Sequence, residues 1–520
     1  MIDLEAIRLL ADIPAAQAAR QGAARAIRFE GRDTSYAELS AATNRIANAL
    51  GAQGIGAGDR VALLSKNHDR WYPLFFGTAL ARACLAPVNC RLTASEIGFI
   101  LGDAAPRVLL VGEDFFEVAL AAVAGLAEPP RLVALYGQHP AFETFEAWLG
   151  GASDALPAER PQLSDPVLQL YTSGTTGLPK GVVLDNANYR TFLELASEVE
   201  GFAYGEGETV MIVMPLFHVA GTNISFSALA QGAGIVLIKD FNAAEAIRLI
   251  GAERICHSFL APAMILMMLQ DPGVEHGDYR TLQTIAYGAS PIAEDVLRRA
   301  QARFSCGFVQ FYGMTESTGG GSFLSPADHH VPGKLTSCGR PWPRTELAIL
   351  GPDGQELGVG EIGEIAMRGG IVMRRYWNRP DATAETLSGG WLHTGDLGYR
   401  DADGFYFVHD RIKDMIVSGG ENVYPAEVEG AIMGCPGVAD VAVIGVPDDK
   451  WGEAVKALVV AGPGQTPDPA AVIAWARERI AGYKVPKSVD FIAALPRNPS
   501  GKILRRELRA PFWEGRERAV

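Results

Sequence analysis

Apolar residues recur along the chain in two patterns, which together predict alternating strands and helices. Helical spacing covers residues 243–250, and Ser35 with Glu38 forms a capping-box signal that opens a helix with Leu39 and Ile46 on its apolar face. Short apolar runs bounded by Gly or Pro are typical of buried parallel strands, and they span residues 61–64, 108–111, 167–171, 210–214, 235–238 and 282–286. The pattern predicts an α/β chain whose helices cover the sheets.

The character of the sequence changes twice in the second half of the chain. From Pro341 to Phe407 glycines cluster and segments shorten, which favours small antiparallel strands and turns. After Lys413 the pattern predicts a compact α+β unit, with helices over 426–433 and 469–481 and strands over 438–446 and 455–461. We therefore predict a large N-terminal domain over 1–412, made of stacked α/β subdomains plus a small β-barrel-like part, and a small C-terminal domain over 413–520.

Length and charge narrow the class of protein. The 520 residues exceed what one hydrophobic core usually supports, which agrees with two or more domains. Lys and Arg number 46 against 60 Asp and Glu, a net charge of −14, so there is no electrostatic case for binding nucleic acid or an anionic membrane surface. An anionic substrate would therefore need locally placed hydrogen-bond donors.

The cysteines and the apolar runs bear on the compartment. Six cysteines are scattered without a CxxC pair, which argues against a zinc site or a disulfide framework and fits a reducing compartment. The first residues do not resemble a signal peptide, and the apolar run 259–269 contains Pro262 and is too short to span a bilayer. We expect a soluble cytoplasmic protein without a transmembrane segment.

Residues 171–181 follow a predicted strand and are rich in hydroxyls, glycines and free backbone N–H groups. Together with one lysine, such a loop can wrap a polyphosphate. It is not a Walker loop, because Pro179-Lys180-Gly181 stands where Gly-Lys-Ser/Thr is required. The alternative is a solvated surface loop. The predicted phosphate-binding residues are Thr172, Ser173, Gly174, Thr175, Thr176, Gly177 and Lys180.

Four further segments carry residues suited to nucleotide chemistry. In residues 312–316 the Tyr312 ring can stack on a purine, Thr315 can donate to a phosphate, and Glu316 can hold Mg²⁺. Asp396 can chelate the two ribose hydroxyls, although an Asp in a turn is more often a backbone cap. A glycine-rich turn over 418–425 follows a charged linker, and Lys502 stands on a turn near the end of the chain. Taken singly, each segment also has an ordinary structural explanation.

In this order, the segments resemble the adenylate-forming superfamily, which includes acyl-CoA synthetases, 4-coumarate–CoA ligase, firefly luciferase and peptide-synthetase adenylation domains. The similarity runs from the helix at Ser35 to Lys502, and five motifs in sequence are far more specific than any one. The resemblance implies an AMP-forming carboxylic acid:CoA ligase that uses ATP, Mg²⁺ and coenzyme A. The acid first forms an acyl-adenylate and releases pyrophosphate; the CoA thiol then displaces AMP.

The resemblance also implies roles for individual residues. Lys502 matches the lysine that bridges the carboxylate and the α-phosphate, Thr172 and Glu316 match the Mg²⁺ positions, and Asp396 and Arg411 match the ribose contacts. Lys413 matches the hinge of a mobile C-terminal domain. At Val417 several relatives carry a lysine, so that contact is left unassigned here. The remaining nucleotide positions are Gly288, Ala289, Ser290, Phe311, Tyr312, Gly313, Met314 and Thr315, and the CoA positions are Ser418, Gly419, Gly420, Glu421, Trp451 and Tyr483.

The same resemblance places His218 at the mouth of the acyl pocket. Amino-acid-activating relatives carry an Asp there, so an amino acid substrate is not expected; the ordinary alternative is a core histidine. The rest of the expected wall lacks Arg and Lys, so a second substrate carboxylate would have no partner. Fatty and aryl acids both fit this wall, which consists of Ala220, Gly221, Thr222, Asn223, Ser225, Tyr287, Gly288, Gly319, Gly320 and Gly321. Thr222, Asn223 and Ser225 either bind a phenolic hydroxyl or face the backbone.

Other functions stay open at this point. The acyl group can instead pass to the phosphopantetheine of a carrier protein, or the reaction can stop at the adenylate. A protein of another class, a nucleotide-binding acid sensor without catalysis, is disfavoured because Lys502, Glu316 and Asp396 are all present. A kinase is excluded by the missing Walker ending. The expected partners are a small carboxylic acid, ATP and CoA, with a homodimer as one option for assembly.

Overall fold

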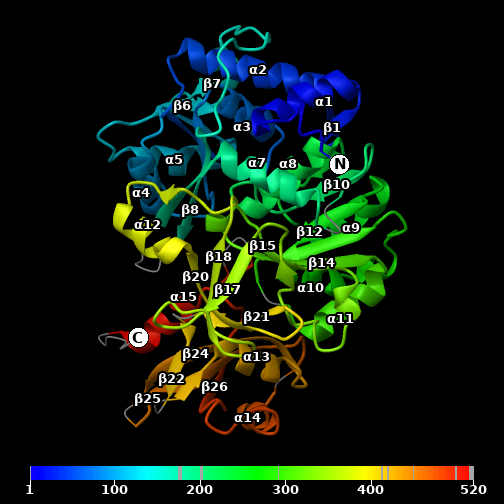
Figure 1. The fold of residues 1–520 in the computed structure, drawn as a ribbon, viewed down its shortest axis with the longest axis vertical. Helices are drawn as coiled ribbons and strands as arrows, with labels where there is room; N and C mark the ends of the chain where they lie inside the picture. The colour runs from blue at the N-terminus through cyan, green and yellow to red at the C-terminus, as the bar shows by residue number, and fades with distance from the viewer. Residues whose placement is uncertain are drawn as a thin grey trace.

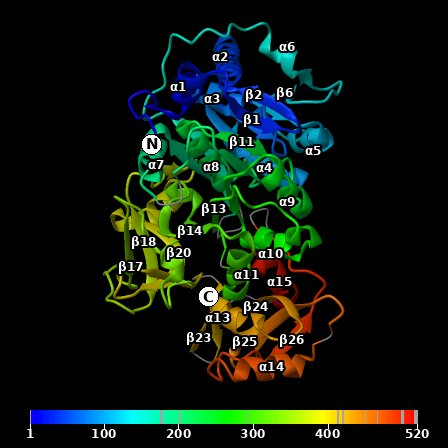
Figure 2. The same cartoon turned by 90° about the vertical axis from the view of Figure 1, so that its right-hand side faces the viewer.

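The computed structural model describes residues 2–173, 179–199, 203–290, 292–411, 414–418, 421–448, 450–465, 467–497 and 501–514. Within these residues the strands form four sheets. Three belong to the N-terminal part, and the fourth belongs to a C-terminal unit that lies at one end of the molecule, orange to red in Figures 1 and 2. The predicted mixed α/β class is confirmed.

The first sheet has a parallel centre and antiparallel edges. Its strand order is β16-β15-β14-β13-β12-β10-β11-β1-β2, and the strands from β14 to β1 in this order run parallel. The strands are β1 (Arg25–Phe29), β2 (Arg32–Ser35), β10 (Thr209–Ile212), β11 (Gly234–Leu237), β12 (His257–Leu260), β13 (Thr284–Gly288), β14 (Gly307–Gly313), β15 (Gly321–Leu324) and β16 (Arg340–Pro341). The predicted parallel runs at 210–214, 235–238 and 282–286 all fall in this sheet.

The second sheet has the order β19-β9-β8-β4-β3-β5-β6-β7. Its strands are β3 (Arg60–Leu64), β4 (Cys84–Val88), β5 (Val108–Val111), β6 (Arg131–Ala134), β7 (Glu143–Thr144), β8 (Pro166–Ser173), β9 (Pro179–Asp185) and β19 (Arg375–Tyr376). Strand β8 is parallel to β4, as predicted, but antiparallel to β9. The phosphate loop therefore connects two neighbouring antiparallel strands rather than a strand and a helix.

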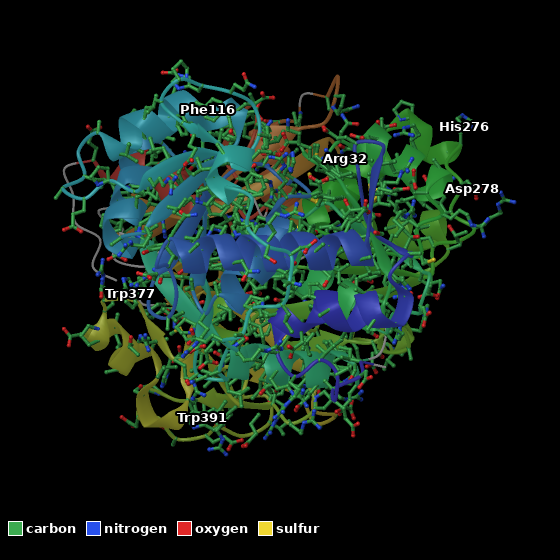
Figure 3. The ribbon with its side chains drawn as sticks, turned by 90° about the horizontal axis from the view of Figure 1, so that it is seen from above. Arg32, Phe116, His276, Asp278, Trp377 and Trp391 are labelled. Atoms are coloured by element: carbon green, nitrogen blue, oxygen red, sulfur yellow. The ribbon has the colours of Figure 1, made fainter. Side chains whose placement is uncertain are left out.

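Helices separate and cover the two large sheets. The largest core gathers apolar residues of both sheets with those of helices α2, α3, α7 and α8, while α9, α10 and α11 cover the other face of the first sheet. Helices α4 and α5 cover the outer face of the second sheet, where Phe116 marks α5 in Figure 3. Their bounds are α1 (Ile13–Gln21), α2 (Tyr36–Ala52), α3 (Trp71–Leu80), α4 (Ala94–Ala104), α5 (Phe116–Val123), α6 (Phe145–Leu149), α7 (Asn186–Ala196), α8 (Val219–Gln231), α9 (Ala243–Ala252), α10 (Pro262–Gln270), α11 (Glu294–Phe304) and α12 (Pro380–Thr386).

The third sheet and the C-terminal unit are the smaller parts. The third sheet is antiparallel throughout, as predicted for the glycine-rich segment, and comprises β17 (Glu346–Leu350), β18 (Gly363–Arg368), β20 (Leu392–Arg400) and β21 (Tyr406–Arg411). The C-terminal sheet comprises β22 (Ile416–Ser418), β23 (Glu421–Val423), β24 (Val438–Asp448), β25 (Gly452–Ala461) and β26 (Ser488–Phe491), with α13 (Pro425–Met433), α14 (Pro469–Arg477) and α15 (Arg505–Trp513). Short 3₁₀ helices complete the chain: η1 (Leu10–Asp12), η2 (Glu113–Phe115), η3 (Pro272–Glu275), η4 (Thr315–Ser317), η5 (Asp328–His330) and η6 (Ser388–Gly390).

Local signals read from the sequence recur in the structure. Ser35 caps helix α2: its backbone N–H donates to Glu38 Oε2 (2.8 Å), and the Glu38 N–H donates back to Ser35 Oγ (3.2 Å). This reciprocal pair satisfies two backbone donors that a helix start otherwise leaves unpaired. In the described part of the chain, the helices are too short or too polar to cross a bilayer.

Candidate active site

The residues that follow four parallel strands of the first sheet meet at one edge of that sheet. His218 follows β10, Ala261 follows β12, Ala289 follows β13 and Glu316 follows β14. In open α/β sheets, ligands bind outside the carboxyl ends of the parallel strands. The topology therefore brings segments that are far apart in the sequence to the edge where a ligand is expected.

Glu316 lies buried at this edge, in η4, with a relative exposure of 6 %. The Tyr376 hydroxyl donates to Glu316 Oε1 (2.8 Å), and Thr172 Oγ1 lies 3.5 Å from the same oxygen. Thr172 in turn stands opposite Lys180 in the β8–β9 pair. The structure thus brings together Thr172, Lys180 and Glu316, three of the described residues predicted for phosphate and Mg²⁺.

Tyr376 is a site residue that the sequence did not reveal. It reaches Glu316 because β19 pairs with β9, with Tyr376 opposite Val182, and the Lys180 ammonium lies 5.0 Å from the centre of its ring. Burial first, and then the negative charge of Glu316, raises the pKa of the Tyr376 hydroxyl. The phenol therefore stays protonated and holds the carboxylate as a hydrogen-bond donor.

A second pair joins the first sheet to the third. The Tyr312 hydroxyl on β14 donates to Asp396 Oδ2 on β20 (2.8 Å), and burial followed by the Asp396 charge raises the pKa of Tyr312. Asp396 is buried, and its backbone is the cross-strand partner of Arg411. A ring suited to a purine and a carboxylate suited to ribose hydroxyls therefore lie next to each other, as the adjacent base and sugar of one nucleotide require.

The predicted adenine segment at 288–290 has two unusual backbone features. A side chain on Gly288 would collide with the carbonyl oxygen of Phe311, so only glycine lets β13 and β14 approach at this point. Ala289 is exposed and has φ +67°, a left-handed conformation that a residue with a side chain rarely adopts. Such strain clusters at binding sites. Ser290, next along the chain, is half-buried.

The predicted nucleotide-binding residues from Phe311 to Thr315 differ in burial and in whether the side chain or the backbone is exposed. The Phe311 side chain lies in the core with the rings of Phe259 and Trp342, so only its backbone faces the Gly288 segment. Gly313 is exposed, and a Cβ there would lie 2.5 Å from the carbonyl oxygen of Gly319. Met314 and Thr315 are half-buried.

His218 is the N-cap residue of α8. A Cβ on Gly221 would lie 2.5 Å from the carbonyl oxygen of Pro215, so the glycine lets the helix start directly against the end of the β10 segment. His218 Nε2 is buried and has no hydrogen-bond partner among the described residues. Burial, and then the charge of Arg91, lowers the pKa of His218 to about 4, so the imidazole is neutral at pH 7.

This low pKa predicts an acid-dependent loss of stability. In the unfolded chain His218 takes up a proton near pH 6.5, but in the folded chain it does so only near pH 4. The contribution of the neutral His218 to the unfolding free energy is therefore fully present above pH 6.5 and is lost as the pH falls from 6.5 to 4. We expect H218Q, which cannot titrate, to lose on the order of 1 kcal/mol less unfolding free energy than the wild type between pH 7 and pH 5. Urea unfolding at both pH values measures this, with H276Q, at an exposed histidine (Figure 3), as the control. An identical loss in H218Q and wild type would contradict it.

The other predicted acyl-pocket residues fall into two groups. Ala220, Thr222 and Asn223 lie on α8, and the Asn223 amide nitrogen donates to the carbonyl oxygen of Thr318 (2.7 Å), next to Gly319. Tyr287 does not join them: its ring lies in the core under α9–α11, and its hydroxyl is 3.0 Å from His329 Nε2. That side chain lies on the face of the sheet opposite α8. Gly320 is buried against Ile371 and Trp342.

Lys502 reaches the same edge from the C-terminal unit. A Cβ on Gly501, its neighbour, would lie 3.7 Å from Ala261 Cβ and 3.6 Å from Ala263 Cβ. The turn that carries Lys502 therefore rests on the start of α10, directly after β12. Arg505, which follows on α15, is committed to an ion pair with Glu429 (2.7 Å). Lys502 thus stands where a nucleotide at the carboxyl edge of the first sheet would lie.

Part of the predicted CoA site comes together in the C-terminal sheet. Ser418 is buried, pairs with the exposed Glu421 across the β22–β23 hairpin, and also pairs with Gly452, the neighbour of Trp451. Trp451 is 40 % exposed, and Tyr483, on the loop after α14, is 42 % exposed. Large exposed aromatic side chains of this kind are available to a ligand.

Several predicted residues lie outside what the structure describes. They are Gly174, Thr175, Thr176 and Gly177 of the phosphate loop, Lys413 at the expected hinge, and Gly419 and Gly420 of the glycine-rich turn, together with the side chains of Ser173 and Arg411. These assignments stay predictions from the sequence.

Comparison with known proteins agrees with this geometry. Residues 14–377 match the family model of AMP-binding enzymes, and residues 427–502 match the model of the AMP-binding enzyme C-terminal domain. The chain belongs to the AMP-binding enzyme family, a family of ATP-dependent adenylate-forming enzymes. The resemblance seen in the sequence is confirmed.

Relatives and solved structures are similar over nearly the whole chain. The fatty acid–[acyl-carrier-protein] ligase ScoC of Streptomyces coeruleorubidus is 43 % identical over 500 residues, 95 % of each chain. The feruloyl-CoA synthase of an Amycolatopsis species is 40 % identical over 491 residues, 94 % of this chain and 96 % of the relative. The crystal structure of the anthranilate CoA ligase AuaEII in complex with anthranoyl-AMP is similar with a TM-score of 0.90 at 26 % identity, over 97 % of both chains.

Proposed function

We propose that this enzyme is an AMP-forming carboxylic acid:CoA ligase. The observation that carries the proposal is the meeting of three groups at one sheet edge: the Thr172–Glu316 pair, the Tyr312–Asp396 pair and the turn that bears Lys502. They come from different sheets and from the C-terminal unit, and together they supply one contact for each part of ATP. The names of the relatives, which include ligases for CoA and for a carrier protein, support this reaction class.

Each part of the nucleotide is assigned to residues along this edge of the sheet. The ring of the partly buried Tyr312 stacks on adenine, Asp396 accepts hydrogen bonds from the ribose hydroxyls, and Thr172 with Lys180 binds phosphate oxygens. Thr172 and Glu316 offer a hydroxyl and a carboxylate 3.5 Å apart, both hard oxygen ligands of the kind that Mg²⁺ prefers together with substrate phosphates. When bound there, Mg²⁺ neutralises charge on the phosphates of ATP.

In the first half-reaction, a carboxylate oxygen of the acid attacks the α-phosphorus of ATP. The new acyl–O–P bond forms as the bond to the pyrophosphate oxygen breaks, and negative charge builds up on the α-phosphate. The Lys502 ammonium stabilises that charge more in the transition state than in the bound substrates, which is the condition for lowering the barrier. The packing of the Gly501 turn on Ala261 and Ala263 supports assigning this arrangement of the two parts to adenylation.

In the second half-reaction, the CoA thiol loses its proton and its sulfur attacks the acyl carbon. The thioester C–S bond forms, the bond between the acyl carbon and the phosphate oxygen breaks, and AMP leaves. The proposal includes a rotation of the C-terminal unit about Lys413 between the two steps. That rotation would bring the β22–β23 hairpin, with Ser418 and Glu421, to the edge that Lys502 leaves.

The acid is proposed to be a fatty or aryl monocarboxylate. Helix α8 supplies His218, which is neutral at pH 7, and the small residues Ala220 and Gly221, and it contains no charged side chain from Val219 to Gln231. A second carboxylate or an ammonium group would therefore have no counter-charge on this helix. A reducing, cytoplasmic setting is part of the proposal because all six cysteines are free thiols, and a homodimer is its expected assembly.

A panel of fatty and aryl acids tests the proposal. We expect acid-dependent pyrophosphate release, with AMP accumulating over many turnovers when CoA is present. Phosphopantetheinylated carrier protein, added in place of CoA, tests the second candidate acceptor, which the 43 % identical carrier-protein ligase favours. Turnover with the carrier protein but not with CoA would show that the acyl acceptor is the carrier protein rather than CoA. ATP binding without pyrophosphate release for any acid would show a sensor rather than an enzyme.

A further inference from the structure

Most polar side chains of α8 are satisfied within the protein. Thr222 Oγ1 donates to the Val219 carbonyl (3.0 Å), and Ser225 Oγ donates to the Gly221 carbonyl (2.7 Å). Ser227 Oγ accepts from the Gln231 side-chain amide (3.1 Å). These bonds within the helix answer the question that the sequence left open for Thr222 and Ser225: their hydroxyls face the backbone.

Asn223 differs from its neighbours because half of its amide is unpaired. Its Nδ2 donates to the Thr318 carbonyl (2.7 Å), and since a carbonyl only accepts, this bond fixes the orientation of the amide. The oxygen Oδ1 is then left buried without a hydrogen-bond partner among the described residues, in a side chain only 5 % exposed. A buried acceptor without a donor is costly, so each native example calls for an explanation.

The position of Asn223 points to the acyl pocket. It lies four residues after Val219 and three after Ala220, so the three side chains share one face of the helix, with Asn223 about one turn, roughly 5 Å, deeper than the half-buried residues at the helix start. A Cβ on Gly319 would lie 2.8 Å from Asn223 Nδ2 and 3.3 Å from Val219 Cγ2. Glycine at 319 therefore lets the segment that follows Glu316 pack directly against Asn223 and Val219 on this face of α8.

We infer that Asn223 is a specificity-determining residue that selects acids bearing a hydroxyl group on an otherwise apolar body. The hydroxyl would donate to Asn223 Oδ1 and would give the buried acceptor its missing partner. An ammonium donor fits less well, because α8 has no carboxylate to balance its charge. The inference rests on the proposed ligase function and adds the substrate class that this function leaves open.

The expected preference has a physical basis in an asymmetry of buried polar sites. A site built to accept a hydrogen bond rejects an analogue without the donor, because binding that analogue seals an unpaired oxygen away from water. A wall without an unpaired acceptor would instead accept both analogues about equally. We expect the wild type to prefer hydroxylated acids by at least ~10-fold in kcat/KM.

Matched pairs of acids test this directly: cinnamic against 4-hydroxycinnamic acid, and octanoic against 8-hydroxyoctanoic acid, each followed by pyrophosphate release. In N223L, the hydroxylated member of the preferred pair should lose at least ~10-fold while the plain member is retained or improved, so the ratio falls to about one. S227A is the matched control on the same helix, because Ser227 Oγ accepts from the Gln231 side-chain amide and Ser227 is not part of the expected acyl-pocket wall, and its ratio should stay at the wild-type value.

The results of this experiment distinguish a failure of the role assigned to Asn223 from a failure of the proposed ligase function. Equal kcat/KM for both members of both pairs in the wild type would overturn the role of Asn223 but would not contradict the ligase function. This result comes from the wild type alone, so it does not depend on whether a variant folds. A parallel loss on both members in N223L would show a structural role only and would also overturn it. An absence of pyrophosphate release with every acid would overturn the ligase function itself.

Discussion

Replacing Lys502 with alanine should slow acid-dependent pyrophosphate release by roughly 10²–10³-fold, the loss expected when one donor to the developing charge is removed. Thioester formation from supplied acyl-adenylate should be nearly unchanged, because in the second step the α-phosphate leaves with AMP and gains no new bond. The Gly501 turn packs against Ala261, which lies at the edge where we propose that the first step takes place. Single-turnover assays of the two half-reactions measure both rates.

The control for this experiment is R506A, an exposed cation on the same segment. Both half-reactions should proceed at the wild-type rate in R506A, because the loss in K502A depends on the position of the Lys502 charge and not on the net charge of the C-terminal segment. If K502A slowed both steps equally, the assignment of Lys502 to adenylation alone would be refuted.

The second large effect is expected at Glu316. Glutamine at this position keeps an oxygen that can accept from Tyr376 but removes the negative charge, so E316Q isolates the electrostatic role of the carboxylate. We expect adenylation to fall by roughly 10²-fold and the Mg²⁺ concentration needed for half-maximal rate to rise, since a carboxylate is the strongest hard ligand offered here. Initial rates over a Mg²⁺ titration give both quantities.

Y376F is the matched comparison for Glu316. It keeps the carboxylate charge and removes only the hydroxyl that holds Oε1, so we expect a loss of about tenfold or less and a smaller change in the Mg²⁺ requirement. A wild-type Mg²⁺ dependence in E316Q would mean that Glu316 does not organise the metal.

The fold could be predicted from the sequence to a large extent, and the reasons are physical. Buried parallel strands need apolar residues on both faces, so runs such as 108–111 stand out, and the Ser35–Glu38 capping box is local enough to be read directly. The reversal at 171–181 could not be read in the same way. Strand β9 lies between β8 and β19, and β19 stands almost two hundred residues further along the chain, so its place beside β9 is not visible in the local pattern.

The candidate site could be predicted where short motifs carry the chemistry. Glu316, Asp396 and Lys502 stand in recognisable segments, whereas Tyr376 is a lone tyrosine whose role arises only when β19 pairs with β9. The direction of Tyr287 depends on which face of β13 meets α8, and the sequence pattern does not show this. The unpaired oxygen of Asn223 depends on the Thr318 carbonyl, a contact between distant segments.

The central claim is that the acid attacks the α-phosphorus of ATP before any thiol reacts. The most direct test is complete turnover with an acid labelled with ¹⁸O in its carboxylate, followed by mass spectrometry of the products. Attack at the α-phosphorus and later cleavage at the acyl carbon transfer one labelled oxygen to AMP, and none to pyrophosphate. We expect singly labelled AMP; unlabelled AMP, or label in pyrophosphate or inorganic phosphate, would contradict attack at the α-phosphorus.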